Sequence, residues 1–382
     1  MKTRSHRSPR RARRSLSAVS LLLILAGGGC SGGGETTLTG AMASPRHGHT
    51  ATALPDGRVL LAAGLTKTSP PGAAEIFDPK KNAFEAAAGL EVRPRGWHRA
   101  TPLRDGRVLL SGGWAGPFTA LREAVAIRPG GRGTPPVLML QGRYDHTATL
   151  LADGTVLLAG GNDGRGEQRA MEIFDPQAGR FLPTARPLLV PRQLHTATLL
   201  PGGEVLILGG AQGDGARIAE LYLPAERRTR LVRSYAAAAR SRHTATRLPD
   251  GRVLIAGGLG PDRTLDTAEL FDPRKGAFLP VKARMRTARQ QHTATLLPDG
   301  RVVLLGGWGG GEGRTLGDGE IFDPEGACFA PLSVPLRAKR RLHTATLLDG
   351  GGVLAAGGAS DDEVLATAEI LRVPPRKPGG GC

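Results

Sequence analysis

Residues 289–307 read RQQHTATLLPDGRVVLLGG, and a closely similar stretch, RSRHTATRLPDGRVLIAGG, occupies residues 240–258. Both begin with the pattern R-x-x-H, continue through a short apolar run to an Asp-Gly pair, and end with a second apolar run and Gly-Gly. An Asp-Gly pair between two short apolar runs is typical of a tight β-hairpin turn. The stretch therefore predicts two antiparallel strands joined by a hairpin.

The same pattern recurs along the whole chain. R-x-x-H occurs seven times, with 48 to 51 residues between successive histidines, and Gly follows each of these histidines by fifteen positions. Every copy then has a Glu in a third segment. The repeated residues are the arginines Arg46, Arg95, Arg143, Arg192, Arg240, Arg289 and Arg340, the histidines His49, His98, His146, His195, His243, His292 and His343, and the glutamates Glu75, Glu123, Glu172, Glu220, Glu269, Glu320 and Glu369. A period of this length indicates one supersecondary unit per copy.

The composition agrees with many short strands joined by turns. The 382 residues include 56 Gly and 29 Pro, whereas aromatic residues make up only 4%. One sheet of four short strands cannot bury both of its faces, but a ring of such sheets buries each face against a neighbour and leaves only short edges. The sequence therefore predicts an all-β fold, a seven-bladed β-propeller with four-stranded antiparallel blades.

These repeats resemble the kelch family, which has a Gly pair after the second strand, acidic and aromatic positions in the third, and an aromatic position in the fourth. The resemblance covers about residues 36–373 and implies a kelch-type propeller similar to the central domain of galactose oxidase, with the R-x-x-H strand innermost. Two copies depart from the pattern. Ala63 replaces the first Gly of the pair in the first copy, and residues 127–129 replace the Phe-Asp-Pro turn in the second.

The two ends of the repeat region complement each other. The last copy stops after its third strand, near Val373, and the tail at residues 374–382 has no strand pattern. Residues 36–42 stand where other copies have their fourth strand. We therefore expect this N-terminal segment to pair into the last blade and close the ring.

The N-terminus predicts export. Residues 1–29 carry seven Lys and Arg and no acidic residue, and their apolar run at residues 16–26 is too short to span a bilayer. Cys30 follows, within the Gly-rich residues 27–34, and resembles the lipidated cysteine of bacterial lipoproteins. This resemblance implies a signal peptide at residues 1–29, lipidation of Cys30, a tether at residues 30–35 and an outer-membrane location. The alternative is cleavage into a periplasmic or secreted form.

Charge and cysteine content limit the partners. The formal charge of +17 falls to +10 once the seven basic residues of the predicted signal are removed. No compact run of Lys or Arg remains, so we expect no nucleic-acid partner and contact with a membrane only through the lipid anchor. We expect a monomer whose partner is an unknown protein or glycan. Cys328 and Cys382 either form one bridge or stay free.

The repeated Arg, His and Glu residues point to structure. A catalytic site needs a unique constellation, whereas a residue present in every blade serves the packing of that blade. The seven Glu match the seven Arg, which favours charge-assisted hydrogen bonds within or between blades. The alternative is a ring of Arg that attracts an anionic ligand to the mouth of the central channel. We expect no metal site and no cofactor, and we identify no catalytic residue in the sequence.

Residues outside the repeat are better candidates for ligand binding. Trp114 and Trp308 directly follow the Gly pair of their copies, and Trp97 precedes His98. Exposed Trp rings suit sugars or peptide side chains through stacking and apolar contact. We therefore take Trp97, Trp114 and Trp308 as candidate ligand-binding residues, with the alternative that their rings only cover a blade edge.

These features favour a binding or interaction module of the cell envelope for a protein or glycan. The alternative is a carbohydrate-active enzyme with its site at the channel mouth, either similar to sugar oxidases or similar to a sugar mutarotase. Resemblance to galactose oxidase would imply a copper site of two Tyr, two His and a Tyr–Cys crosslink. The chain has only Tyr144, Tyr222 and Tyr235, and its candidate histidines occupy repeat positions, so we expect no copper.

Overall fold

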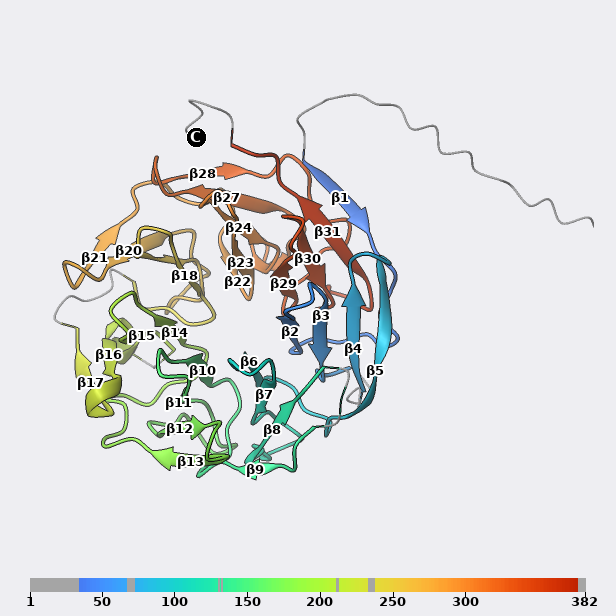
Figure 1. Cartoon of the computed structure of the whole chain (residues 1–382). Coiled ribbons are helices and arrows are strands. Elements are labelled where there is room, and N and C mark those ends of the chain that lie inside the picture. The colour runs from blue at the N-terminus through green and yellow to red at the C-terminus, as the bar shows by residue number, and fades with distance from the viewer. Residues whose placement is uncertain are drawn as a thin grey trace, which may run out of the picture. The chain divides into compact units, whose positions relative to one another are not determined.

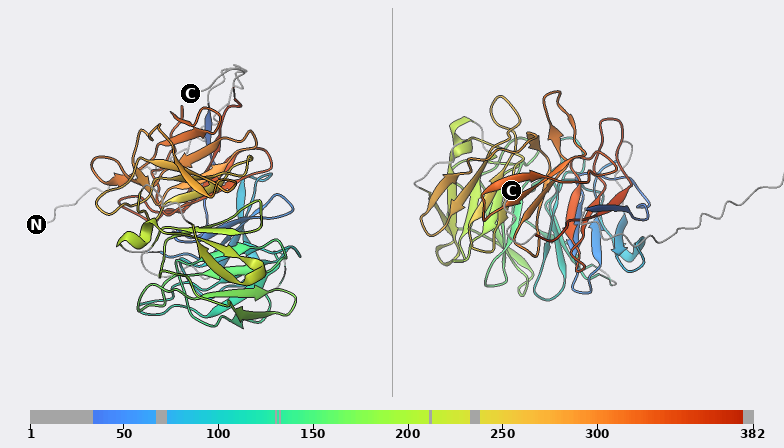
Figure 2. Two further views of the ribbon diagram at one scale, coloured as in Figure 1. Left: turned by 90° about the vertical axis from the view of Figure 1, so that its left-hand side faces the viewer. Right: turned by 90° about the horizontal axis from the view of Figure 1, so that it is seen from above.

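The computed structural model describes residues 34–66, 73–129, 131, 133–210, 213–232 and 238–376. The predicted signal peptide, Cys30 and Cys382 lie outside these ranges. Within them, seven four-stranded antiparallel sheets follow one another around a common axis (Figure 1). Seen from the edge, the strands run through the thickness of the ring (Figure 2). The predicted all-β propeller with four-stranded blades is confirmed.

Each blade is built from consecutive strands, except that β25 and β26 interrupt blade 6 and that the last blade includes β1. The first four blades contain β2 (Thr50–Ala53), β3 (Val59–Ala62), β4 (Ala73–Asp78) and β5 (Ala83–Glu91); β6 (Arg99–Pro102), β7 (Val108–Ser111), β8 (Glu123–Ile127) and β9 (Val137–Leu138); β10 (Thr147–Leu150), β11 (Val156–Ala159), β12 (Met171–Asp175) and β13 (Arg180–Pro183); and β14 (Thr196–Leu199), β15 (Val205–Leu208), β16 (Ala219–Leu223) and β17 (Arg228–Leu231). The last three contain β18 (Thr244–Arg247), β19 (Val253–Ala256), β20 (Ala268–Asp272) and β21 (Ala277–Pro280); β23 (Thr293–Leu296), β24 (Val302–Leu305), β27 (Gly319–Asp323) and β28 (Cys328–Pro331); and β29 (Thr344–Leu347), β30 (Val353–Ala356), β31 (Ala368–Arg372) and β1 (Glu35–Leu38).

A few elements lie outside this plan. Blade 4 has two short 3-10 helices, η1 (Gly213–Arg217) and η2 (Pro224–Glu226). Blade 6 has a small additional sheet of β22 (Arg289–Gln290), β25 (Trp308–Gly309) and β26 (Arg314–Thr315). In the described part of the chain, no helix is long and apolar enough to cross a membrane.

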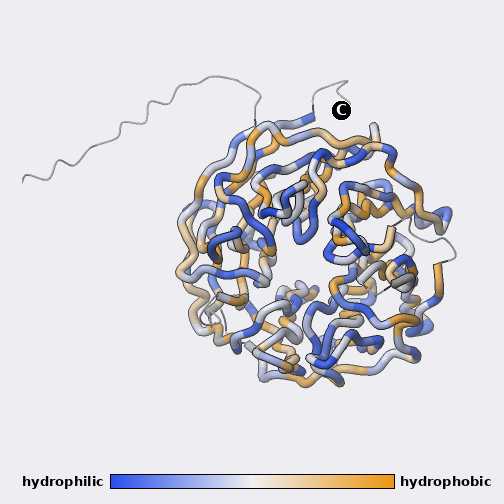
Figure 3. The backbone as a smooth tube through the Cα atoms, turned by 180° about the vertical axis from the view of Figure 1, so that it is seen from behind, coloured by the Kyte–Doolittle hydropathy of each residue, from blue (hydrophilic) through white to orange (hydrophobic). Residues whose placement is uncertain are grey.

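The first strand of every blade is innermost, as the kelch resemblance implies. Each first strand contacts the first strand of the next blade, and β29 contacts β2, so the ring is closed. Every residue of the seven second strands is buried. Hydrophobic residues therefore occur in the blades all around the ring (Figure 3).

The hydrophobic core lies between the blades. One cluster joins Leu61 and Phe77 of blade 1 to Leu354 and Ala356 of blade 7, and each of the other six clusters likewise combines side chains of two neighbouring blades. Fully burying a Leu or Phe side chain stabilises a fold by about 1.5–3 kcal/mol. Blades therefore depend on their neighbours for most of their stabilisation.

The Gly pairs allow neighbouring blades to approach closely. In all seven copies the backbone N–H of the second Gly donates to the carbonyl of the repeated Arg in the next blade, including Gly358 to Arg46. At Gly160, the first of its pair, a methyl group would lie only 2.5 Å from the carbonyl oxygen of Arg192. The chain also has a positive φ there, so a side chain is excluded by space and by backbone conformation.

Ring closure by the N-terminal segment is confirmed. β1 pairs antiparallel with β31 in a register that joins Thr36 to Leu371. Beyond the strand, the N–H of Met42 donates to the carbonyl of Ala366, and the Met42 side chain is buried. The first and last segments of the propeller are thereby held in one sheet.

The start of the C-terminal tail also contacts blade 6. Arg376 forms ion pairs with Asp323 and Glu325, and the carbonyl of Pro374 accepts a hydrogen bond from Arg301. Cys328 in β28 is disulfide-bonded, which excludes the alternative in which it stays free.

We predict that deleting residues 36–42 destabilises the propeller by about 2–5 kcal/mol, because it exposes the edge of β31 and removes the buried Met42 side chain. Thr37→Ala is the matched control, since Thr37 is exposed and its substitution keeps the strand. Urea unfolding of both variants measures the difference. Equal stability of the deletion variant and the intact propeller would show that β1 does not hold the ring together.

Candidate functional site

The seven repeated arginines are buried and each forms an ion pair within its own blade. Their Nη1 atoms donate to the carbonyl of the residue at the first position of the Gly pair. The pairs are Arg46–Glu75, Arg95–Glu123 (3.2 Å), Arg143–Glu172 (2.7 Å), Arg192–Glu220 (2.9 Å), Arg240–Glu269 (2.7 Å), Arg289–Glu320 (3.1 Å) and Arg340–Glu369 (2.7 Å). Six of these carboxylates also accept a backbone N–H of the segment that enters the blade.

Glu123 differs from the other six glutamates. Val125 faces Leu110 at the place where Glu172 faces Leu158 in the next blade, so Glu123 stands two residues early in its strand. Its side chain is 26% exposed, whereas the others are at most 4% exposed, and it also pairs with Arg93 at 2.6 Å. The copies are therefore less equivalent at this position than the sequence pattern suggests.

The seven repeated histidines link neighbouring blades. Each Nε2 lies 2.9–3.1 Å from a hydroxyl of the preceding blade, and the hydroxyls belong to Thr344, Thr50, Ser111, Thr147, Thr196, Thr244 and Thr293. The Thr147 hydroxyl also lies 3.5 Å from a carbonyl of its own blade, which assigns the shared proton to Nε2 of His195. Each Nδ1 is buried without a hydrogen-bond partner among the described residues, and burial is the main cause that lowers the histidine pKa values, followed by the nearby arginine charges.

We predict that the propeller loses stability steeply in acid. Burial lowers the pKa of His49 and His243 to about 3, and the pKa values of the other five lie well below 6.5. Below pH 6.5 the unfolded chain therefore binds more protons than the folded chain, so stability present above this pH is lost as the pH falls toward 3. Each histidine contributes up to about 1.4 kcal/mol per pH unit.

Urea unfolding as a function of pH measures this proton uptake. Replacing His243 by Gln keeps a donor for Thr196 and should reduce the uptake on unfolding by one proton. An uptake that is the same in both proteins would contradict the assignment of a neutral, buried His243.

A ring of backbone hydrogen bonds surrounds the axis where the first strands begin. It joins the residues two positions after each repeated Arg, which we call the entrance ring. In each, the N–H donates to the carbonyl of its counterpart in the preceding blade, at 2.9–3.4 Å. The members are Gly48, Trp97, Asp145, Leu194, Arg242, Gln291 and Leu342, all with φ between 51° and 59°. The backbone here is the same in every blade, so only the side chains distinguish one position from another.

Three charged side chains gather at this end of the axis. Burial raises the pKa of Asp145 to about 6, and the charges of Arg99 and Arg242 oppose that rise. The Asp145 carboxylate and the Arg242 guanidinium have no hydrogen-bond partner within the described residues, and Asp145 is only partly buried. Asp145 is therefore a solvent-accessible carboxyl that changes its charge near neutral pH, which suits a general acid or base.

An aromatic cluster lies beside these charges. The ring of Trp97 is 5.5 Å from Trp114, 6.3 Å from Tyr144 and 6.2 Å from His47, measured between centroids. A methyl group at Gly48 would lie 3.0 Å from Nε1 of Trp97, so the absence of a side chain there makes room for the indole. The structure thus brings two of the three candidate tryptophans together next to Asp145 in the entrance ring.

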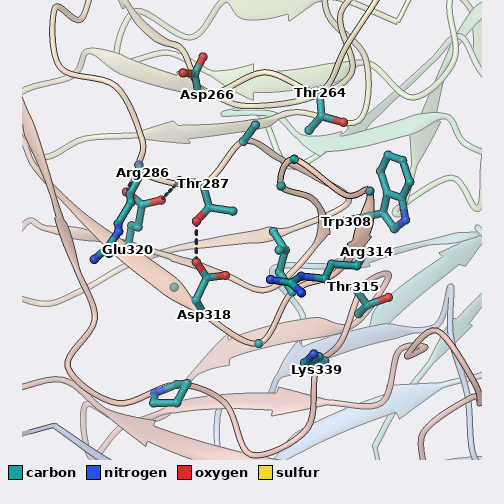
Figure 4. A pocket seen from close by; sticks show the side chains of 18 of the residues that line it. Thr264, Asp266, Arg286, Thr287, Trp308, Arg314, Thr315, Asp318, Glu320 and Lys339 are labelled. Atoms are coloured by element: carbon teal, nitrogen blue, oxygen red, sulfur yellow. Dashed lines mark hydrogen bonds between the residues drawn. The ribbon is translucent and has the colours of Figure 1, made fainter.

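The third candidate, Trp308, lies in a separate pocket over blade 6. This pocket has a volume of about 1370 Å³ and is lined by side chains that include Thr287, Trp308, Arg314, Asp318 and Lys339 (Figure 4). The Asp318 carboxylate accepts a hydrogen bond from the Thr287 hydroxyl at 2.8 Å and lies 3.3 Å from Nη2 of the buried Arg289. The pocket is large; one oxygen of the Asp318 carboxylate is bound by neighbouring side chains, and its Oδ1 is buried without a hydrogen-bond partner among the described residues.

The two candidate sites therefore differ in what they leave free. Oδ2 of Asp318 is held by Thr287 and Arg289 and its Oδ1 is buried without a partner in the described part of the chain, whereas Asp145 and Arg242 keep polar atoms that no described residue binds and that are not fully buried. Unsatisfied, accessible charges are available to a ligand. We therefore take the entrance ring as the better candidate for a catalytic site.

Asp145, Arg99 and Arg242 were not among the site residues predicted from the sequence. The available signal was a departure from the repeat: Arg99 directly follows His98, whereas Thr follows the other six repeated histidines. Asp145 and Arg242 occupy a position that varies from copy to copy, so no pattern distinguishes them before the ring is formed.

Comparisons with known proteins identify the fold. No family model matches the sequence, and no curated protein matches it. Among solved structures, the chain is similar to one described as a novel fungal alcohol oxidase of the AA5 family in complex with copper. The TM-score is 0.73, the identity is 16%, and the match covers 90% of this chain and 76% of that one. This likeness shows a kelch-type propeller fold like that of galactose oxidase, and at this identity it shows the fold alone.

The comparison corrects our leading functional hypothesis. A binding or interaction module was expected first and an enzyme second, but the fold is shared with an enzyme. The residues that the structure describes nevertheless contain no group of three or more His, Cys, Asp or Glu that could hold a metal ion. The repeated histidines use Nε2 for hydroxyls, and Tyr222 lies buried within blade 4. These residues do not fit a copper site of the galactose oxidase kind.

Proposed function

We propose that this chain is a carbohydrate-active enzyme that acts at the entrance ring and catalyses the interconversion of sugar anomers, as a mutarotase does. The observation that carries the proposal is the accessible Asp145 carboxyl beside Arg99 and Arg242, with the Trp97 cluster next to it. Indole and phenol rings offer apolar faces on which a sugar ring packs. The charged groups then lie at the edge of the same surface.

The reaction uses only groups that this chain supplies. The Asp145 carboxylate removes the proton from the anomeric hydroxyl while the bond between the anomeric carbon and the ring oxygen breaks. The ring oxygen gains negative charge, which a guanidinium stabilises, and it takes a proton from water. Closure on the opposite face of the carbonyl reverses these proton transfers and yields the other anomer. No electrons leave the sugar, so the reaction needs no oxidant.

The pKa of Asp145 supports this role. A general base is most effective when its pKa lies near the working pH, and an Asp with its ordinary pKa would be a weaker base by about two pH units. Burial raises the pKa of Asp145, and the two arginines keep the rise small enough for the carboxylate to be ionised at pH 7.

We predict that the rate of anomer exchange rises through about pH 6 and levels off above it, because Asp145 must be ionised to accept a proton. Asp145→Asn should lower the rate about 100–10,000-fold and remove this pH dependence. Nuclear magnetic resonance exchange between the anomers of a hexose measures both. Asp153→Asn is the control, since Asp153 lies in the hairpin turn after β10 and, among the described residues, hydrogen-bonds only to Thr155.

Two results would contradict the proposal. The first is an Asp145→Asn rate equal to that of the unchanged protein on every hexose that it turns over. The second is the absence of any exchange above the rate in water with neutral and acidic hexoses alike.

We also propose that the chain is an exported bacterial kelch lipoprotein anchored through Cys30. The basic start, the short apolar run and the Gly-rich segment around Cys30 support this. We predict that Cys30→Ser moves the protein from the membrane fraction to the soluble fraction, because the thiol that would carry the lipid is gone. Ser31→Ala serves as the control. If Cys30→Ser remains in the membrane fraction, the chain is not anchored at this residue.

A further inference from the structure

The loop between β7 and β8 carries an apolar side chain at its solvent-exposed tip. Phe118 is 85% exposed, more than any other large hydrophobic residue in the described part of the chain. In the four other blades whose corresponding loop is described in full, the exposed tip carries charged residues, among them Arg165, Asp262, Glu312 and Asp361. The fold therefore does not require an apolar residue here. Leaving a Phe in water also forgoes the stabilisation that its burial would bring.

The backbone at Phe118 is in an unfavourable conformation as well. Its φ is 55°, in a region that a bulky residue rarely adopts. Two hydrogen bonds hold the loop in this shape: the N–H of Ala115 donates to the carbonyl of Thr119 at 3.1 Å, and the N–H of Thr119 donates to the carbonyl of Gly116 at 3.0 Å. Residues in such conformations persist only where the surrounding structure fixes them, and they cluster at ligand-binding sites. The position of Phe118 is thus set before any ligand arrives.

Blade 3 supports the loop tip and connects it to the aromatic cluster. A methyl group at Gly164 would lie 2.7 Å from the carbonyl oxygen of Phe118, so the two loops touch only because this residue has no side chain. The N–H of Gly164 donates to Oδ1 of Asn162, and Asn162 exchanges backbone hydrogen bonds of 2.8 and 3.0 Å with Tyr144. The loop tip therefore stands next to the part of blade 3 that carries Tyr144.

The same loop begins at the other side of the cluster. Trp114 exchanges backbone hydrogen bonds of 2.8 and 3.0 Å with Gly96, the residue before Trp97, and the two indole rings are 5.5 Å apart. Among the described residues, the ring of Phe118 has no aromatic neighbour. Phe118 therefore extends the aromatic surface outward from the entrance ring, over blades 2 and 3, and does not add to the contacts within the cluster.

We propose that Phe118 forms a second sugar subsite and that the substrates are reducing oligosaccharides, whose reducing-end ring packs on Trp97 and whose next ring packs on Phe118. This deepens the function proposed for the entrance ring and rests on it. The anomeric carbon must be free for exchange at Asp145, so the next ring is attached at the far end of the first. Aromatic rings bind sugars through their apolar faces. Since Phe118 is already held in place, binding the second ring orders little of the protein.

The test compares monosaccharides with β-1,4-linked disaccharides that have the same reducing ring. The pairs are glucose with cellobiose, galactose with galactobiose, and mannose with mannobiose. Calorimetry gives the dissociation constants, and nuclear magnetic resonance exchange gives KM. In the pair that the unchanged protein prefers, we expect both values to be at least about tenfold lower for the disaccharide, and Phe118→Asn to reduce this difference to less than about twofold. The values for the monosaccharide should not change.

Three variants separate binding from structure. Asn tolerates a positive φ, so Phe118→Asn should keep or raise the melting temperature. Phe118→Tyr keeps an aromatic ring and should keep the preference for the disaccharide. Leu138→Asn is the matched control, because Leu138 is an exposed apolar residue of β9 in the outer strand of the same blade, and this substitution should leave all values unchanged.

Three results would overturn the inference. The first is equal binding of monosaccharide and disaccharide by the unchanged protein in all three pairs. The second is a full preference for the disaccharide in Phe118→Asn. The third is an equal loss of affinity for both sugars in this variant, because Phe118 would then contact the first ring. The proposed function fails separately, when anomer exchange does not depend on Asp145, and calorimetry still tests Phe118 in that case because binding requires no exchange.

Discussion

The propeller depends on hydrogen bonds between neighbouring blades, in which a neutral histidine of each blade binds a hydroxyl of the preceding blade. One buried hydrogen bond of this kind contributes only about 1 kcal/mol, but the seven form a closed circle in which every blade is bonded to both of its neighbours. Above this circle runs the second ring, of backbone hydrogen bonds. Since both rings close, no blade can shift along the axis without breaking bonds to two neighbours.

Burial is the main reason why the histidines of this circle stay neutral, and the charges of the buried arginines add to it. Seven guanidinium groups lie close to seven imidazoles, and their charges help to keep the pKa values of these imidazoles low. A buried guanidinium is costly unless it is paired, and the paired Glu of each blade provides that compensation together with a backbone carbonyl. In six blades the paired Glu also accepts a backbone N–H of the segment that enters the blade, and the paired Arg donates to backbone carbonyls. One ion pair therefore holds the third strand, the entering segment and the Gly pair in place.

How much of this could be predicted from the sequence depends on repetition. The fold, the inner position of the R-x-x-H strand and the closure by β1 follow from a pattern that occurs seven times and from the order of its parts. Features present once were not predictable in the same way. The ion pair of Arg376 with Asp323 joins residues 53 positions apart with no local pattern, and the early position of Glu123 became visible only from the strand register.

The site residues were missed for the same reason, but the repeat itself gives a way to find them. A residue type shared by six blades is explained by the fold itself. A different residue at that position in the seventh blade is therefore one that the fold does not require. A substitution that removes a hydrogen bond would not persist unless the loss of the bond were harmless or the new side chain were useful. Ser111 supplies a replacement hydroxyl to His146, which shows that the loss of the hydroxyl at position 99 was not harmless. Likewise, Gly48 leaves the space that the Trp97 indole fills.

The entrance ring can carry such departures because its backbone is fixed independently of its side chains. Each member already uses its N–H and carbonyl to bind its two neighbours, so replacing Leu194 or Gln291 by another residue leaves those bonds in place. The positive φ at all seven positions holds the side chains at similar orientations around the axis. The Asp145 carboxylate, the Arg242 guanidinium and the Trp97 indole can therefore occur together at one end of the axis without any change in the backbone hydrogen bonds of the ring.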